Sequence, residues 1–145
     1  MANSLQPQPD DALQRALAPA ILDQCADAVI FADVSGVIRV WNAQAAALFG
    51  FTAEEALGAS LDLIIPERLR EAHWTGFERA IQSGVTRLNG RATITRGLHK
   101  TGKRLYVEMS FAVVRGPDGT AAGSAAIARD ATERYEEERR RRAQG

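Results

Sequence analysis

The sequence predicts an α+β domain in which five antiparallel strands form one sheet and helices pack on one face of it. Two observations predict this architecture. Extended apolar segments fall into a group of two near the start of the chain and a group of three near its end, and a block of short helical segments separates the groups. The length of 145 residues fits one such domain with a flanking helix at each end.

The N-terminal part of the chain divides into a polar tail and a helix. Residues 1–10 are polar, contain two prolines and lack an apolar signal segment, so we expect a disordered tail. A flanking helix is predicted over residues 11–25, because Leu13, Leu17 and Ile21 recur at helical spacing. Pro19 predicts a kink in this helix or its division into two shorter ones.

The main domain is predicted to cover residues 26–130 and to open with a β-hairpin. Residues 27–33 and 37–41 are apolar extended segments, and the Val-Ser-Gly sequence between them is typical of a turn. These segments form the first group of strands.

Three helical segments follow the hairpin, and each has a recognisable first residue. Asn42 can cap a short helix, Thr52 forms a capping box with Glu55 at the start of the second, and Pro66 suits the first position of a longer helix over residues 67–82.

The second group of strands is predicted at residues 86–98, 103–115 and 120–128. Two turn sequences, Lys-Thr-Gly and Gly-Pro-Asp-Gly, separate them. Residues 131–145 are predicted to form a charged C-terminal signalling helix and tail, in which glutamates precede arginines and so suit the helix dipole.

Composition excludes several classes of function. The 18 basic and 18 acidic residues balance, so no basic face for direct nucleic-acid contact is expected. The single cysteine, Cys25, excludes an intramolecular disulfide and a thiolate zinc site. No apolar run approaches the roughly 18 residues of a membrane span, so we expect a cytoplasmic protein without membrane contact. No catalytic triad, phosphate-binding loop or two-histidine metal motif is present, and we expect no enzymatic activity.

Seven short sequences resemble those of PAS domains, in the same order. They are AVIFAD at residues 28–33, GVI at 36–38, WN at 41–42, LFG at 48–50, EEALG at 54–58, KTG at 100–102 and RDATER at 129–134. The resemblance covers about residues 20–135. It implies a PAS sensor domain, which holds a small ligand or cofactor between sheet and helices and signals by contact with another protein.

His73 is the candidate metal ligand. On a helix it shares one face with Leu69 and Phe77, where a neutral imidazole can ligate iron or bond a backbone carbonyl. The spacing from Pro66 to His73 is similar to that in oxygen-sensing heme PAS domains, in which the histidine is the proximal ligand. This resemblance implies heme b, and it places Arg79 and Arg87 where cationic residues hold the heme propionates.

The distal side departs from those oxygen sensors, because Thr93 stands where they carry an arginine. Arg91, two residues earlier on the same face of a strand, could act as the distal donor. Strand alternation opposes this, since Ala92 and Ile94 make the other face more apolar. Met109 is a candidate core residue and a candidate sixth ligand.

The other candidate pocket residues are apolar. The last strand is rich in alanine, which leaves volume for a cofactor or for a bulky side chain such as Trp74 or Phe111. The complete set of candidate cofactor-binding residues is His73, Arg79, Arg87, Arg91, Leu69, Trp74, Phe77, Ile94, Met109, Phe111, Ala126 and Ala128. His99 lies beside a turn and is expected to be exposed.

Three functions remain open at this point: a heme-based sensor of O2, CO, NO or redox state, a PAS module that binds FAD or a small organic ligand, and a ligand-free dimerisation module. The flavin photosensors of the family carry an Asn-Cys pair on a short helix where this chain has Ala-Ser-Leu-Asp at residues 59–62, so covalent flavin chemistry is not expected. A homodimer through the N-terminal helix is expected in each case, because that helix has an apolar stripe to cover.

Overall fold

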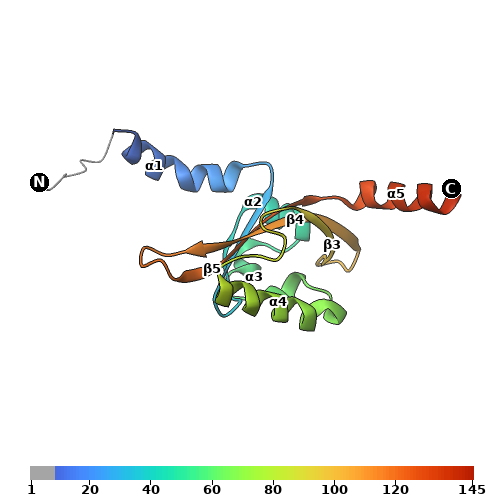
Figure 1. The fold of residues 1–145 in the computed structure, drawn as a ribbon. Coiled ribbons are helices and arrows are strands. Elements are labelled where there is room, and N and C mark those ends of the chain that lie inside the picture. The colour runs from blue at the N-terminus through green and yellow to red at the C-terminus, as the bar shows by residue number, and fades with distance from the viewer. Residues whose placement is uncertain (1–8) are drawn as a thin grey trace, which may run out of the picture.

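The computed structural model describes residues 9–145 (Figure 1). The tail predicted to be disordered lies outside this range except for Pro9 and Asp10, which are helical. In chain order the elements are α1 (Pro9–Gln24), β1 (Ala28–Asp33), β2 (Ile38–Trp41), α2 (Ala43–Phe49), α3 (Ala53–Ala56), the 3-10 helices η1 (Leu61–Ile64) and η2 (Glu67–Leu69), α4 (Arg70–Ser83), β3 (Thr93–Leu98), β4 (Arg104–Arg115), β5 (Ala121–Asp130) and α5 (Thr132–Gln144).

The strands form one antiparallel sheet in the order β2-β1-β5-β4-β3. The helices between β2 and β3 gather on one face of the sheet, and α1 and α5 project from opposite sides of the domain (Figure 1). The predicted α+β class with five antiparallel strands is therefore confirmed.

Alternation along the strands divides the sheet into an inner and an outer face. On β4 the buried residues are Leu105, Val107 and Met109, and the residues between them are only half-buried. The inner face packs against α2, where Phe49 is almost fully buried, and against Ile64 of η1. The core thus lies between the sheet and the short helices.

Asn42 joins three elements of this core. Its Oδ1 accepts hydrogen bonds from the backbone N–H groups of Val29 (2.9 Å) and Ala45 (3.0 Å). Its Nδ2 donates to the carbonyl oxygens of Leu22 (2.8 Å) and Asp27 (3.0 Å). One buried side chain therefore caps α2 and fastens it to β1 and to the end of α1.

Three predicted elements differ from the structure. The helix predicted over residues 67–82 is divided into the 3-10 helix η2 and the α-helix α4, which begins at Arg70. The strand predicted from residue 86 begins only at Thr93, because Asn89 (φ 51°) and Gly90 (φ 83°) adopt left-handed backbone conformations that interrupt a strand. The helix α1 is continuous through Pro19 over 16 residues, so the predicted division into two helices does not occur.

Candidate functional site

A cavity of about 400 Å³ lies between the inner face of the sheet and the segment from η1 to α4. This volume is within the range of sites that hold small ligands and cofactors. Its walls are mostly apolar and include Ile30 of β1, Phe49 of α2, Ile64 of η1 and Val107 of β4. Thr93, Thr95 and Ser124 supply hydroxyl groups from the strands.

Seven of the twelve candidate residues line this cavity. They are His73, Leu69, Phe77, Arg87, Met109, Phe111 and Ala126. The other five, Arg79, Arg91, Trp74, Ile94 and Ala128, do not line it, and their assignment to the site is corrected here.

His73 reaches the cavity from the middle of α4, and its imidazole has no hydrogen-bond partner. Nδ1 is the one buried side-chain nitrogen or oxygen among residues 9–145 that lacks one. The alternative of a histidine bonded to a backbone carbonyl is therefore not what the structure contains. Burial lowers the pKa of His73 below its usual value, against a smaller opposing effect of the Asp62 charge, so the ring is neutral near pH 7.

Trp74 lies outside the cavity because it packs against a different part of the domain. Its indole Nε1 donates a 2.8 Å hydrogen bond to Oδ1 of Asp62, and its ring rests on Gly36, where any Cβ would collide with it. The ring also makes an edge contact with His73, at 4.9 Å between centroids, and with Phe77, at 5.4 Å. Trp74 thus holds the helix that carries His73 against η1 and the β1–β2 turn.

The distal candidate Arg91 is wrong for this site. It precedes β3, is exposed, and its Nε donates to the carbonyl of Leu88 at 3.2 Å. Thr93, two residues later, is the first cavity-facing residue of β3, and Ile94 pairs with Glu108 outside the cavity wall. Arg91 is exposed because β3 begins only at Thr93. The alternation that opposed Arg91 as a distal donor assigned the wrong face of the strand to solvent, since Thr93 and Thr95 line the cavity and Ile94 does not.

Arg79 and Ala128 miss the cavity for different reasons. Arg79 lies on the exposed side of α4, two positions after the buried Phe77. Ala128 is buried, but it lies between Ala28 and Met109 as a strand partner and belongs to the packed core. Arg87 is exposed and also lines the cavity, so it stands where the cavity opens to solvent.

Sequence reasoning missed several residues of the wall, including Thr95, Ser124 and Arg96. The alternation Thr93, Thr95, Gly97 could have identified the cavity face of β3. Arg96 has no such signal, because it lies between Thr95 and Gly97 and so does not follow their alternation. Its guanidinium lies 5.8 Å from the ring centroid of Tyr106, its cross-strand partner.

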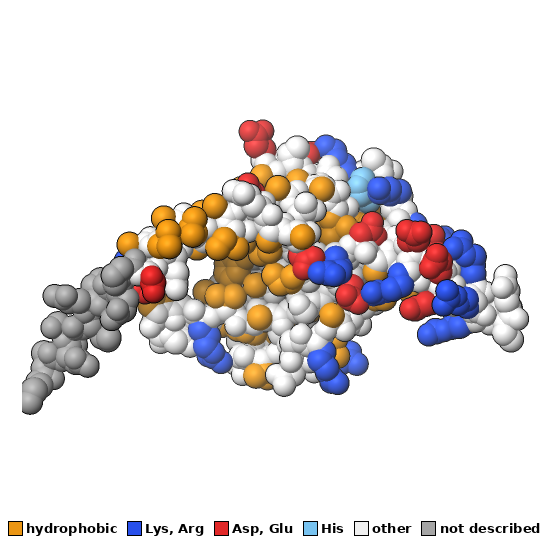
Figure 2. Space-filling view, turned by 90° about the horizontal axis from the view of Figure 1, so that it is seen from above, with side chains coloured by type: hydrophobic (Ala, Val, Ile, Leu, Met, Phe, Trp, Pro, Cys, Tyr) orange, Lys and Arg blue, Asp and Glu red, His pale blue; other side chains and the backbone are white. Residues whose placement is uncertain are grey.

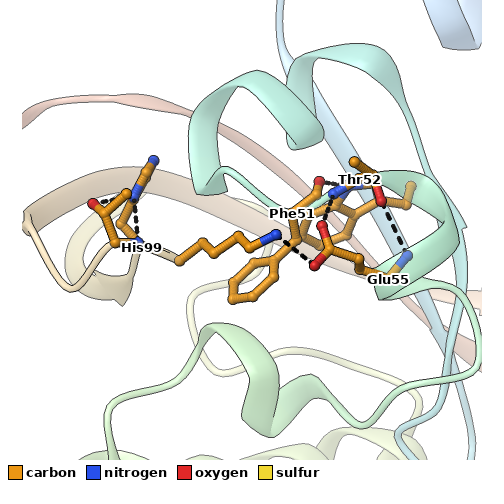
Figure 3. Close-up of polar contacts among 7 residues, drawn as sticks. Phe51, Thr52, Glu55 and His99 are labelled. Atoms are coloured by element: carbon orange, nitrogen blue, oxygen red, sulfur yellow. Dashed lines mark hydrogen bonds and ion pairs between the residues drawn. The ribbon is translucent and has the colours of Figure 1, made fainter.

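His99 is buried beside the β3–β4 turn, so the prediction that it is exposed is wrong. It packs against Gly50, and its Nδ1 accepts from the backbone N–H of Thr101 at 3.1 Å. The adjacent Lys100 pairs with Glu55, at 2.6 Å between Nζ and Oε2, beside the capping box of α3 (Figure 3). His99 is therefore a structural residue outside the cavity.

Seen from above, hydrophobic and charged side chains occupy different parts of the surface (Figure 2). Hydrophobic side chains follow α1 and surround a hollow beside it, and charged side chains concentrate at the other end, around α5. Leu13, Leu17 and Ile21 of α1 are 58%, 45% and 63% exposed. The apolar stripe of α1 is therefore uncovered within a single chain.

Two kinds of feature are absent from the described part of the chain. No helix among residues 9–145 has both the length and the apolar character to cross a bilayer. No cluster of three or more histidine, cysteine or acidic side chains within that range is arranged to hold a metal ion.

Comparison with known proteins assigns the fold. The chain is 27% identical over 92 residues to the sensor protein FixL of Bradyrhizobium diazoefficiens, an alignment that covers 63% of this chain and 18% of FixL. It is also 34% identical over 92 residues to an uncharacterized protein of Azorhizobium caulinodans, covering 63% of this chain and 12% of that protein. The chain thus spans less than a fifth of the length of these relatives.

Among solved structures, the PAS domain of a Colwellia psychrerythraea protein superposes with a TM-score of 0.70 at 24% identity and covers 84% of this chain and 98% of that one. An RNA-binding light-oxygen-voltage receptor gives 0.71 at 22% identity, over 94% of this chain and 37% of that one. The sequence profile described as PAS fold matches residues 22–136. The chain therefore belongs to the PAS fold family and contains a PAS sensor domain.

Proposed function

We propose that this PAS domain holds heme b in the cavity with His73 as an axial ligand. It senses a diatomic gas or redox state and passes the change to another protein by contact rather than by catalysis. The observation that carries the proposal is the His73 side chain, which is half-buried at the cavity wall and whose buried Nδ1 has no hydrogen-bond partner. A buried polar atom without a partner costs free energy, and a bound metal would remove that cost.

The residues around His73 fit an iron porphyrin. Iron ligation requires a neutral imidazole, and burial favours this form by lowering the pKa of His73. Leu69, the last residue of η2, and Phe77 of α4 flank the ring, and the opposite wall is mostly apolar. When bound, heme would supply an iron centre able to bind diatomic gases or change oxidation state.

The opening of the cavity would hold the propionates of heme, and its inner wall would face the iron. Arg87 stands at the opening, where its guanidinium would pair with a propionate carboxylate that remains near solvent. Met109, 7% exposed, lines the inner wall and is the candidate for a sixth ligand. With Arg91 outside the cavity, no arginine is proposed on the distal side.

Two further observations support heme. The spacing from Pro66 to His73 resembles that of heme PAS domains, and the chain aligns with the sensor protein FixL. A different ligand remains the alternative, because the similar structures also include light-oxygen-voltage proteins and VqmA bound to DPO. FAD, a small organic molecule or no ligand are therefore outcomes that the test must separate.

The test is a titration of purified protein with hemin, followed by visible absorption. Wild-type protein should give a sharpened, shifted Soret band at a one-to-one ratio, and His73→Ala should lose it while its far-UV circular dichroism stays unchanged. His99→Ala is the matched control, because His99 is the other histidine and does not line the cavity. Equal binding by wild type and His73→Ala contradicts the proposal, as does a flavin spectrum in the protein as purified.

We further propose that the signalling unit is a homodimer formed through α1. The exposed stripe of Leu13, Leu17 and Ile21 supports this, because an apolar helix face of this kind gains stability when a second copy covers it.

A further inference from the structure

The two edges of the sheet differ in how well they are covered. β2 forms one edge and β3 the other (Figure 1). At β2 the segment after α3 bonds the strand, because the N–H of Ile38 donates to the carbonyl of Ala59 and the N–H of Gly58 donates to the carbonyl of Ile38, both at 2.9 Å. The backbone of β3 bonds β4 and, within residues 9–145, no other segment. The outer edge of β3 therefore presents unpaired N–H and C=O groups.

β3 lacks most of the features that protect an edge strand from pairing with another chain. Its six residues, Thr93–Leu98, include no proline, and its register with β4 is continuous without a bulge. Thr93 is exposed and the next three residues are half-buried, so the first part of the strand is accessible. The one protective feature is the charge of Arg96 and of the loops at either end of the strand.

The segment around β3 is strongly basic. Residues 84–107 contain none of the 18 acidic residues of the chain and six of its 18 lysines and arginines, namely Arg87, Arg91, Arg96, Lys100, Lys103 and Arg104. Of these six, only Lys100 forms an ion pair within the described residues, with Glu55. Glu108, which stands opposite Ile94 on β4, is already paired with Arg134. The balanced charge of the whole chain therefore conceals a local excess of positive charge beside this edge.

This excess of positive charge favours one kind of occupant. Positive side chains near an edge oppose pairing with a second copy of the same edge, because like charges would face each other. They attract a strand that carries carboxylates. Nucleic acid suits the charge but not the edge, since phosphate groups only accept hydrogen bonds, whereas a strand edge presents both donors and acceptors.

We propose that β3 is the docking edge for an acidic, extended segment of a partner protein. The segment adds a sixth strand to the sheet, and its backbone bonds the free N–H and C=O groups of β3. Its glutamate or aspartate side chains select the edge through the cations that have no acidic partner. Docking at this edge needs no ligand in the cavity, so it is tested without hemin and stands or falls separately from the heme function.

The first experiment measures the binding of a fluorescein-labelled peptide of alternating glutamate and valine to the full chain by fluorescence anisotropy. The same peptide with lysine in place of glutamate should not bind. N-methylation of every backbone nitrogen removes the hydrogen-bond donors and keeps the charges, and it should weaken binding by at least about tenfold. Absence of saturable binding by the glutamate peptide, or equal binding by its N-methylated form, overturns the proposal.

The second experiment reverses charges at either end of β3. Arg91→Glu and Lys103→Glu alter exposed side chains and should each weaken binding by about fivefold, with unchanged far-UV circular dichroism. Arg142→Glu is the matched control, because it makes a similar change near the end of α5, which projects away from the sheet (Figure 1). Equal weakening by all three variants would be an effect of net charge and would overturn docking at β3.

The third experiment locates the bound peptide by hydrogen exchange and mass spectrometry. Exchange in residues 93–98 should slow when the glutamate peptide binds, because amides at the free edge become bonded, and exchange in residues 38–41 of β2 should not change. Protection elsewhere without protection of β3 contradicts the proposal. Single-stranded oligothymidylate is tested in parallel, and tighter binding than the peptide would make this surface a nucleic-acid site instead.

Discussion

At the scale of single residues, the two histidines make stability depend on pH. Burial lowers the pKa of His73 and of His99 below the ordinary value of 6.5, with Lys103 adding to the effect at His99. The unfolded chain therefore takes up protons near pH 6.5, where the folded chain resists them. Stability is complete above this pH and falls as the pH drops below it.

We predict that the free energy of unfolding of the ligand-free protein falls as the pH drops below about 6.5, by less than about 1.4 kcal/mol per pH unit for each histidine. This pH range lies above the one in which the carboxylates Asp33, Glu55 and Asp118 take up protons, because their pKa values are lowered. Urea unfolding at a series of pH values measures the slope. His73→Gln and His99→Gln should each make it shallower, and a flat wild-type profile would contradict the prediction.

At the scale of elements, the junction at Asn42 should be the costliest helix cap to remove. Asn42→Ala leaves the N–H groups of Val29 and Ala45 without their acceptor in a buried site, so we predict a loss of about 2–3 kcal/mol in the free energy of unfolding. Thr52→Ala is the control, because it removes an exposed cap and should cost about 1 kcal/mol. Urea unfolding compares them, and equal losses would show that the junction adds nothing beyond capping.

Much of the element order could be predicted from the sequence because its signals are local. Single residues determine where several helices begin and end. Asn42 and Thr52 cap helix N-termini, and Gly50 and Gly84 end helices in the left-handed conformation that glycine favours. The start of β3 differs from the prediction because the turn at Asn89 and Gly90 interrupts the alternating apolar residues on either side of it.

The site was harder to predict, because a cavity depends on how elements pack. Helical spacing correctly grouped His73 and Phe77 of α4 with Leu69 at the end of η2, since all three line the cavity. It could not show that Trp74, one residue further round the helix, turns to Asp62 and Gly36 instead. Nor could it show that the loop before β3 brings Arg87 to the opening, since that depends on a turn rather than on periodicity.

At the scale of the whole molecule, the uncovered stripe on α1 predicts a dimer that a single charge should break. Leu17→Glu should convert the protein from dimer to monomer at micromolar concentration, as measured by light scattering, because it places a charge in an apolar interface. Val34→Glu is the control, since Val34 is 51% exposed on the β1–β2 turn, away from α1.

Point substitutions are preferable to deletion of α1, because deletion would remove two hydrogen-bond acceptors. The carbonyl of Leu22 accepts from Asn42, and the carboxylate of Asp23 accepts from the backbone N–H of Ala43. A wild-type protein that is already monomeric would refute the α1 dimer. A Leu17→Glu protein that remains a dimer would place the interface elsewhere.

The most direct test of the proposed heme site is the visible spectrum of His73→Gly protein mixed with heme, recorded before and after addition of imidazole. Removing the side chain leaves a space that free imidazole can enter, so a ligand role for His73 can be restored without restoring the residue. We predict that imidazole returns the wild-type Soret position in His73→Gly and changes nothing in His99→Gly. A His73→Gly protein whose heme spectrum equals that of wild type before any imidazole is added would contradict ligation by His73.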